Sequence, residues 1–153
     1  MNGATLTPGQ SDVAKSLDSE LEEHRNFLQS SAAIGNERLL LGEFPEVWHE
    51  CRQPDWDGYN AAAATIDSLT VALYFLLSLP VGIRLPTVGA TPSGNFTFEW
   101  HHSRRRSLTV IVAEDGYIHY AALLGADIQD GKVAFFDEVP ETILDLIAKV
   151  YEC

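Results

Sequence analysis

The sequence predicts an α+β domain, in which an antiparallel four- to five-stranded meander is packed on one face by a central helix and a C-terminal helix, with an N-terminal helical extension. Three observations carry this prediction. Apolar residues recur at helical spacing over residues 61–79, alternate with polar residues over 96–124, and return to helical spacing after Pro140. Because the expected strands follow one another along the chain, we expect them to pair as neighbours.

The N-terminal region is expected to lie outside the main domain. Residues 1–10 lack periodicity and contain two glycines and a proline, which indicates a flexible tail. A capped apolar stripe begins at Ser11 and ends before Gly35, which predicts a helical extension over residues 11–36. This stripe suits either coverage of the core or pairing with a second chain, so a homodimer through this helix is one expectation. Residues 37–153 are expected to form the single α+β domain.

Three further helices are expected within the domain. A short one fits between Pro45 and Gln53, because proline is well placed at a first helical position. The central helix is expected over residues 61–79, with Asn60 as its cap. It is apolar over most of its circumference, so it should be buried on more than one side. Pro140 is expected to open the last helix.

The strands are predicted from alternation and from turn chemistry. Residues 96–100 and 108–113 alternate, and short strands are expected near 88–91 and 132–136. Asp115-Gly116 is a signal for a two-residue hairpin loop. A loop of that length would create three cross-strand pairs on the face toward the helices: Val112 with His119, Val110 with Ala121 and Leu108 with Leu123.

A polar group on the opposite sheet face supplies a catalytic alternative. In this register Glu99, His101 and Tyr120 share the face that points away from the helices. Glu99 would orient His101 as a general base, and Tyr120 would donate a hydrogen bond to a substrate. A small enzyme or ligand-binding protein is therefore the alternative to a non-catalytic function.

Motifs for phosphate loops, nucleophile elbows and paired CxxC sites are missing from the sequence. His49-Glu50 begins like the HExxH zinc motif, but Gln53 stands where the second histidine would be. We therefore expect no metal ligands and no cofactor.

The charge balance points to the kind of partner. Ten basic residues stand against 22 acidic ones, which gives a net charge of −12. Such a surface repels nucleic-acid phosphates and anionic lipids, so neither nucleic acid nor membrane is expected as a partner. Two cysteines without a secretory signal suit a reducing cytosol, and a cytoplasmic location is expected. We expect a non-catalytic interaction protein that binds a more basic protein, as an antitoxin, immunity protein or chaperone does.

Two short segments supply the candidate binding residues. Trp56, Asp57 and Tyr59 lie around Gly58. In a structural role, the two rings would staple the loop to the sheet and Asp57 would bond free amides at the start of the helix; in a functional role, the same residues would line a shallow pocket. Arg104, Arg105 and Arg106 form a second candidate, since they hold three of the ten basic residues in one expected hairpin loop. They suit a solvated turn, pairing with acidic groups of this chain, or contact with an acidic partner.

Several of these residues also carry a resemblance. The order of motifs resembles a group of small bacterial proteins of unknown function over about residues 54–150. The matching motifs are Trp56-Asp57-Gly58-Tyr59, Thr91-Pro92-x-Gly94, Glu99-Trp100, Asp115-Gly116 and Tyr120-Ala121-x-Leu123-x-Gly125. The resemblance implies a bacterial, cytosolic protein and no particular activity.

Overall fold

A computed structural model describes residues 39–152 of the chain. The predicted tail and helical extension over residues 1–36 lie outside the described residues. The described elements are a π-helical turn η1 (Leu39–Glu43), α3 (Phe44–Cys51), α4 (Ile66–Ser78), β1 (Thr87–Ala90), β2 (Phe96–Ser103), β3 (Arg106–Val112), β4 (Tyr117–Leu124), β5 (Asp127–Ala134) and α5 (Glu141–Val150). This order confirms the predicted α+β fold.

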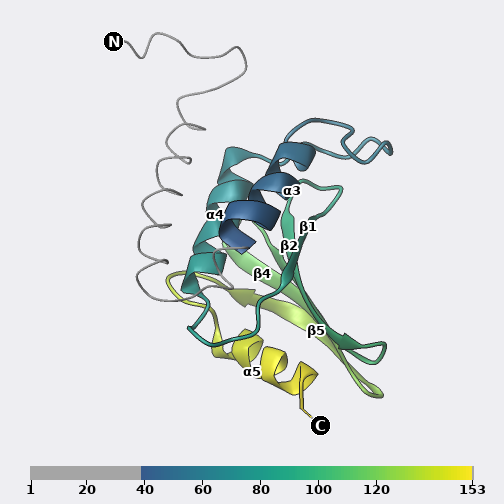
Figure 1. Ribbon diagram of the computed structural model, residues 1–153, viewed down its shortest axis with the longest axis vertical. Coiled ribbons are helices and arrows are strands. Elements are labelled where there is room, and N and C mark those ends of the chain that lie inside the picture. Colours follow the sequence, from purple (N-terminus) through teal and green to yellow (C-terminus); the bar gives the residue numbers. More distant parts are fainter. Residues whose placement is uncertain (1–38, 153) are drawn as a thin grey trace.

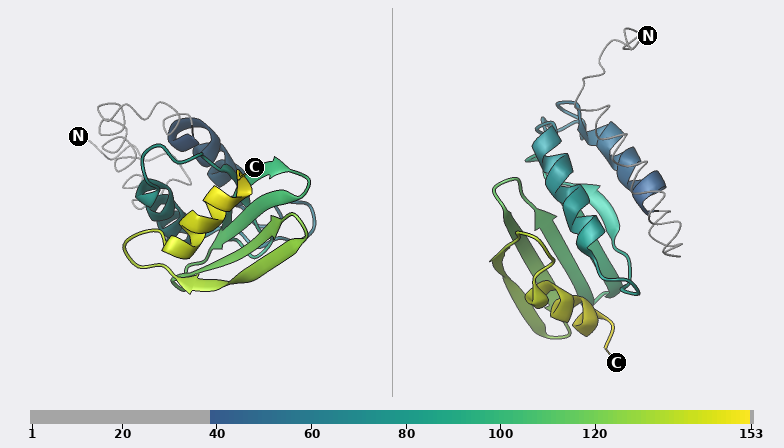
Figure 2. Two further views of the ribbon diagram at one scale, coloured as in Figure 1. Left: turned by 90° about the horizontal axis from the view of Figure 1, so that it is seen from below. Right: turned by 90° about the vertical axis from the view of Figure 1, so that its left-hand side faces the viewer.

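The five strands pair antiparallel in chain order, as a meander predicts. Helices α3, α4 and α5 all lie against one face of the sheet, and the opposite face carries no described helix (Figure 1 and Figure 2). The core fills the space between the helices and the sheet, where the Phe75 ring stacks on Phe98 with ring centroids 5.0 Å apart. None of the described helices is long and apolar enough to cross a membrane.

The loop between β3 and β4 corrects the predicted register. Ala113 N donates to Tyr117 O over 3.1 Å, so the loop comprises the three residues 114–116 rather than two. Gly116 adopts a φ of +89°, which glycine reaches without steric cost and which a three-residue hairpin loop needs at its last position. Because side chains alternate along a strand, this one-residue difference moves every β4 side chain to the other face.

The observed pairs are Val112 with Ile118, Val110 with Tyr120 and Leu108 with Ala122. His119, Ala121 and Leu123, which were expected to face the helices, therefore lie on the open face. The β2–β3 pairing agrees with the prediction, since Phe96, Phe98 and Trp100 share a face with Val112, Val110 and Leu108.

Helix α4 begins at Ile66 and not at Ala61 as predicted. Thr65 is its N-cap, and its hydroxyl accepts a hydrogen bond from Ser68 N over 3.0 Å. The alanines before it have high helix propensity, but their amides are engaged elsewhere. Ala62 N donates to Pro92 O over 2.7 Å, and Ala64 N donates to Cys51 O over 2.8 Å. The tertiary contacts of residues 61–64 thus override their local preference.

The two edges of the sheet differ. Strand β1 has only four residues, and its Val88 N donates to the Glu43 carboxylate over 2.9 Å. Elements η1 and α3 pack beside this strand. Strand β5 has eight residues, and it pairs within the sheet only with β4.

Candidate interaction surface

Several exposed carboxylates lie at one end of the domain. This end is formed by the end of α3, residues 52–65, the start of α4 and the β3–β4 loop, which hydrogen bonds hold together. It exposes the carboxylates of Glu50, Asp55, Asp67, Glu114 and Asp115. We call it the acidic end. Arg52 belongs to this end, but neither residues 53–83 nor residues 107–131 contain a lysine or arginine, so carboxylates outnumber basic side chains there.

Side chains of the loop itself fix residues 54–60 at the acidic end. Asp55 Oδ1 accepts from Asn60 N over 2.6 Å, and Asp57 Oδ1 accepts from Tyr59 N over 2.8 Å and from Ala61 N over 3.2 Å. Asp55 and Asn60 adopt φ values of +58° and +66°. Non-glycine residues in this region are strained, and the surrounding hydrogen bonds hold them there. Asp55 was not among the candidates predicted from the sequence, although aspartate and asparagine tolerate this conformation best.

The two aromatic residues of the loop have different roles. Trp56 Nε1 donates to Ala62 O over 3.1 Å, and its ring packs against the core, as the staple interpretation predicts. Tyr59 is 89% exposed, so the same interpretation is wrong for its ring. Asp57 bonds amides of the loop rather than those at the start of α4, where Thr65 is the cap. The loop therefore presents one tyrosine ring among carboxylates.

The structure does not assemble the predicted polar group of the sheet. Glu99 and His101 lie two residues apart on β2, both exposed on the open face. Thr109 Oγ1 lies 3.5 Å from Glu99 Oε2 on the neighbouring strand. Tyr120 lies on the helix-covered face, because its partner is Val110, and its ring packs against the core. The one-residue change of register therefore separates Tyr120 from its two proposed partners.

The arginine segment lies at the other end of β3, opposite the acidic end. Arg106 Nη1 donates to Lys149 O over 2.6 Å at the end of α5, where a cation is favourable. Arg104 and Arg105 are exposed in the β2–β3 turn. Nearby, the Arg84 guanidinium lies 4.3 Å from the centroid of the Tyr151 ring. One arginine of the three is thus used within the fold and two face solvent.

Cys51 is buried, and this burial raises the pKa of its thiol to about 11. A thiol in that state is protonated and inert near neutral pH. Within residues 39–152, no group of three or more histidine, cysteine, aspartate or glutamate residues is placed to hold a metal ion.

Comparisons with protein families, with curated proteins and with solved structures found no match to this chain. The resemblance read from the motifs therefore stays a prediction.

Proposed function

We propose that this chain is a non-catalytic interaction protein, which binds a more basic protein through its acidic end with Tyr59 as the central contact. The exposure of Tyr59 on a fixed loop carries the proposal. Tyrosine is among the residues that dominate binding energy at interfaces, and it offers a large ring and a hydroxyl at low entropic cost. Because hydrogen bonds within residues 54–61 already hold the loop, it loses little conformational freedom on binding.

The carboxylates of the acidic end determine which partner fits. Asp55 lies in the same loop as Tyr59, and Glu114 accepts a hydrogen bond from Thr65 at the start of α4. A basic partner would be attracted to this end, and the attraction speeds its encounter with the chain. Contact with the Tyr59 ring would then slow dissociation. Such a protein acts by covering a surface of its partner, as an antitoxin, immunity protein or chaperone does.

Photocrosslinking in cells of the source organism tests the proposal. The chain carries p-benzoylphenylalanine in place of Tyr59, or, as a control, in place of Val81, which is 80% exposed beyond the end of α4. We expect one protein with an excess of lysine and arginine to be captured from position 59 and not from position 81. Tyr59→Ala in the wild-type chain should also abolish its co-purification.

Three outcomes would contradict the proposal. The first is equal capture from both positions, which would mean unspecific contact. The second is a captured protein that is itself acidic. The third is co-purification that survives Tyr59→Ala unchanged, since this would place the contact elsewhere on the chain.

A further inference from the structure

The outer edge of β5 presents backbone groups that no other described strand satisfies. Backbone N–H and C=O groups alternate in direction along a strand. Phe135 N donates to Gly116 O over 2.9 Å on the β4 side, so the odd-numbered residues of β5 bond toward β4. The N–H and C=O groups of the even-numbered residues therefore point outward, and these residues are Ile128, Asp130, Lys132 and Ala134.

The same four residues direct their side chains to the open face of the sheet. Val133 shares the helix-covered face with its buried partner Ile118, so its neighbours in β5 point the other way. Ile128 is 74% exposed, and Lys132 Nζ lies on this face 4.6 Å from the Tyr117 ring centroid. Natural proteins usually shield a long strand edge of this kind. The β1 edge is shielded by Glu43, whereas no described element shields β5.

Charge selects one way of pairing this edge with a second copy. An antiparallel pair with its two-fold axis at Gly131 places Asp130 of each copy opposite Lys132 of the other, and Ile128 opposite Ala134. An axis at Asp130 would oppose two aspartates, and an axis at Lys132 would oppose two lysines. In each of these three registers the outward N–H and C=O groups of one copy face those of the other. Only the axis at Gly131 also places Asp130 and Lys132 opposite a residue of opposite charge.

We propose that two copies of the chain pair along β5 in this register, which joins their two five-stranded sheets into one. The outward N–H and C=O groups of both strands bond each other, as strand addition at a sheet edge requires. The two Asp130–Lys132 pairs fix the alignment, and the Ile128 side chains lose part of their exposure to water. The pairing uses residues of β5, and none of them is among the residues that define the acidic end.

Two single substitutions in the full chain test the register. Asp130→Lys opposes lysine with lysine in both pairs, and Lys132→Asp opposes aspartate with aspartate, so each variant alone should be monomeric. An equimolar mixture again opposes lysine with aspartate in both pairs, so the mixture should form a heterodimer. Sedimentation velocity measures the mass of each sample at a chain concentration of about 100 µM. Weak association has dissociation constants between micromolar and millimolar, and this concentration lies within that range. The wild type should sediment as a dimer.

Asp145→Lys and Lys149→Asp are the matched controls, since both residues are exposed on α5 and the changes alter net charge equally. Both control variants should remain dimeric. A monomeric wild type would overturn the proposal. So would single β5 variants that stay dimeric, which would place self-association elsewhere, including the predicted helix at residues 11–36. A mixture that stays monomeric would overturn the register. Control variants that dissociate would show that the change in net charge, and not the position in β5, separates the copies.

Discussion

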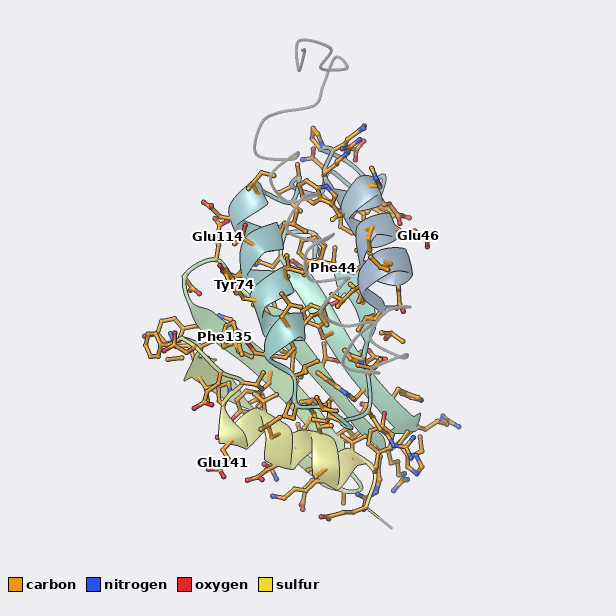
Figure 3. The ribbon with its side chains drawn as sticks, turned by 60° about the vertical axis from the view of Figure 1, so that its left-hand side comes forward. Phe44, Glu46, Tyr74, Glu114, Phe135 and Glu141 are labelled. Carbon is orange, nitrogen blue, oxygen red and sulfur yellow. The ribbon has the colours of Figure 1, made fainter. Side chains whose placement is uncertain are left out.

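The hydroxyl of Thr65 donates a hydrogen bond to Glu114 Oε2 over 2.6 Å, although 49 positions separate the two residues. Thr65 also caps α4 through Ser68 N. The same glutamate oxygen lies 3.3 Å from the hydroxyl of Ser68, which is buried. Figure 3 shows Glu114 beside the first turn of α4. One contact therefore fixes both the start of the central helix and the position of the β3–β4 loop.

Thr65→Ala should lower the free energy of unfolding by about 1–2 kcal/mol, because α4 loses its cap. Thr65→Ser keeps the hydroxyl and should be close to wild type. Urea unfolding measures both. Since Thr65 and Glu114 share one network, the loss in the double variant Thr65→Ala/Glu114→Gln should be smaller than the sum of the single losses. Additive losses would show that the two residues act independently.

Gly94→Ala should be more damaging than Gly82→Ala, although the two glycines have nearly equal φ values of +89° and +87°. A left-handed φ costs an alanine about 1 kcal/mol at either position. A Cβ at Gly94 would lie 2.8 Å from Ala63 O, whereas a Cβ at Gly82 would meet nothing within 4 Å. Overpacking should therefore add about 1–3 kcal/mol at Gly94. Equal urea midpoints for the two variants would contradict this contact.

Substitutions in the 54–60 loop should show that Trp56 stabilises the fold and that Tyr59 does not. Trp56→Ala removes a donor to Ala62 O and a ring packed on the core, so it should destabilise the fold by about 1–3 kcal/mol. Tyr59→Ala should stay within about 0.5 kcal/mol of wild type, because its ring is 89% exposed. Thermal unfolding compares the two variants. A large loss for Tyr59→Ala would mean that its ring supports the fold, which would weaken its assignment to binding.

Burial of Cys51 should slow the reaction of its thiol, and it should make the free energy of unfolding fall at alkaline pH. Burial raises the pKa of the folded thiol to about 11 from an ordinary value of 9.0. In a Cys153→Ser background, its reaction with a disulfide reagent at pH 8 should be about 100-fold slower than that of the unfolded chain, because the thiolate fraction falls tenfold for each unit of pKa. Comparable rates in the folded and unfolded chains would contradict the burial.

The sign of the stability effect follows from the same shift. The unfolded chain loses the thiol proton near pH 9, whereas the folded chain keeps it until about pH 11. The contribution of Cys51 to stability is therefore complete below pH 9 and is lost as the pH rises through this interval. Urea unfolding between pH 8 and pH 11 should show a steeper decline in the Cys153→Ser chain than in Cys51→Ala/Cys153→Ser. Parallel declines would exclude this linkage.

The fold class could be predicted because period and turn chemistry are local signals. Phe96, Phe98 and Trp100 alternate with polar residues, so their position on one shared face could be predicted without knowing where the helices pack. The start of α4 could not be predicted in this way. Residues 61–64 read as helix in isolation, but Cys51 and Pro92 accept hydrogen bonds from two of their amides, and both acceptors are distant in sequence.

The candidate site depended more strongly on long-range contacts. Asp115-Gly116 suits loops of two or three residues, and only the pairing of β4 with β3 shows that Glu114 belongs to the loop. That single residue decides whether Tyr120 joins Glu99 and His101 or faces the core. By contrast, the sequence already marked Trp56, Asp57 and Tyr59 as a group. Their separate roles emerged only with the hydrogen bonds of the loop.

The bond from Val88 N to the Glu43 carboxylate limits how far this sheet can grow. A sheet that is open on both sides can add copies without end, because each addition exposes a fresh edge, and a fibril results. In the pair proposed at β5, each copy would bring its own β1 edge to the far side. Both β5 edges would then be used and both β1 edges covered by η1, α3 and the Glu43 contact, so we expect growth to stop after one addition.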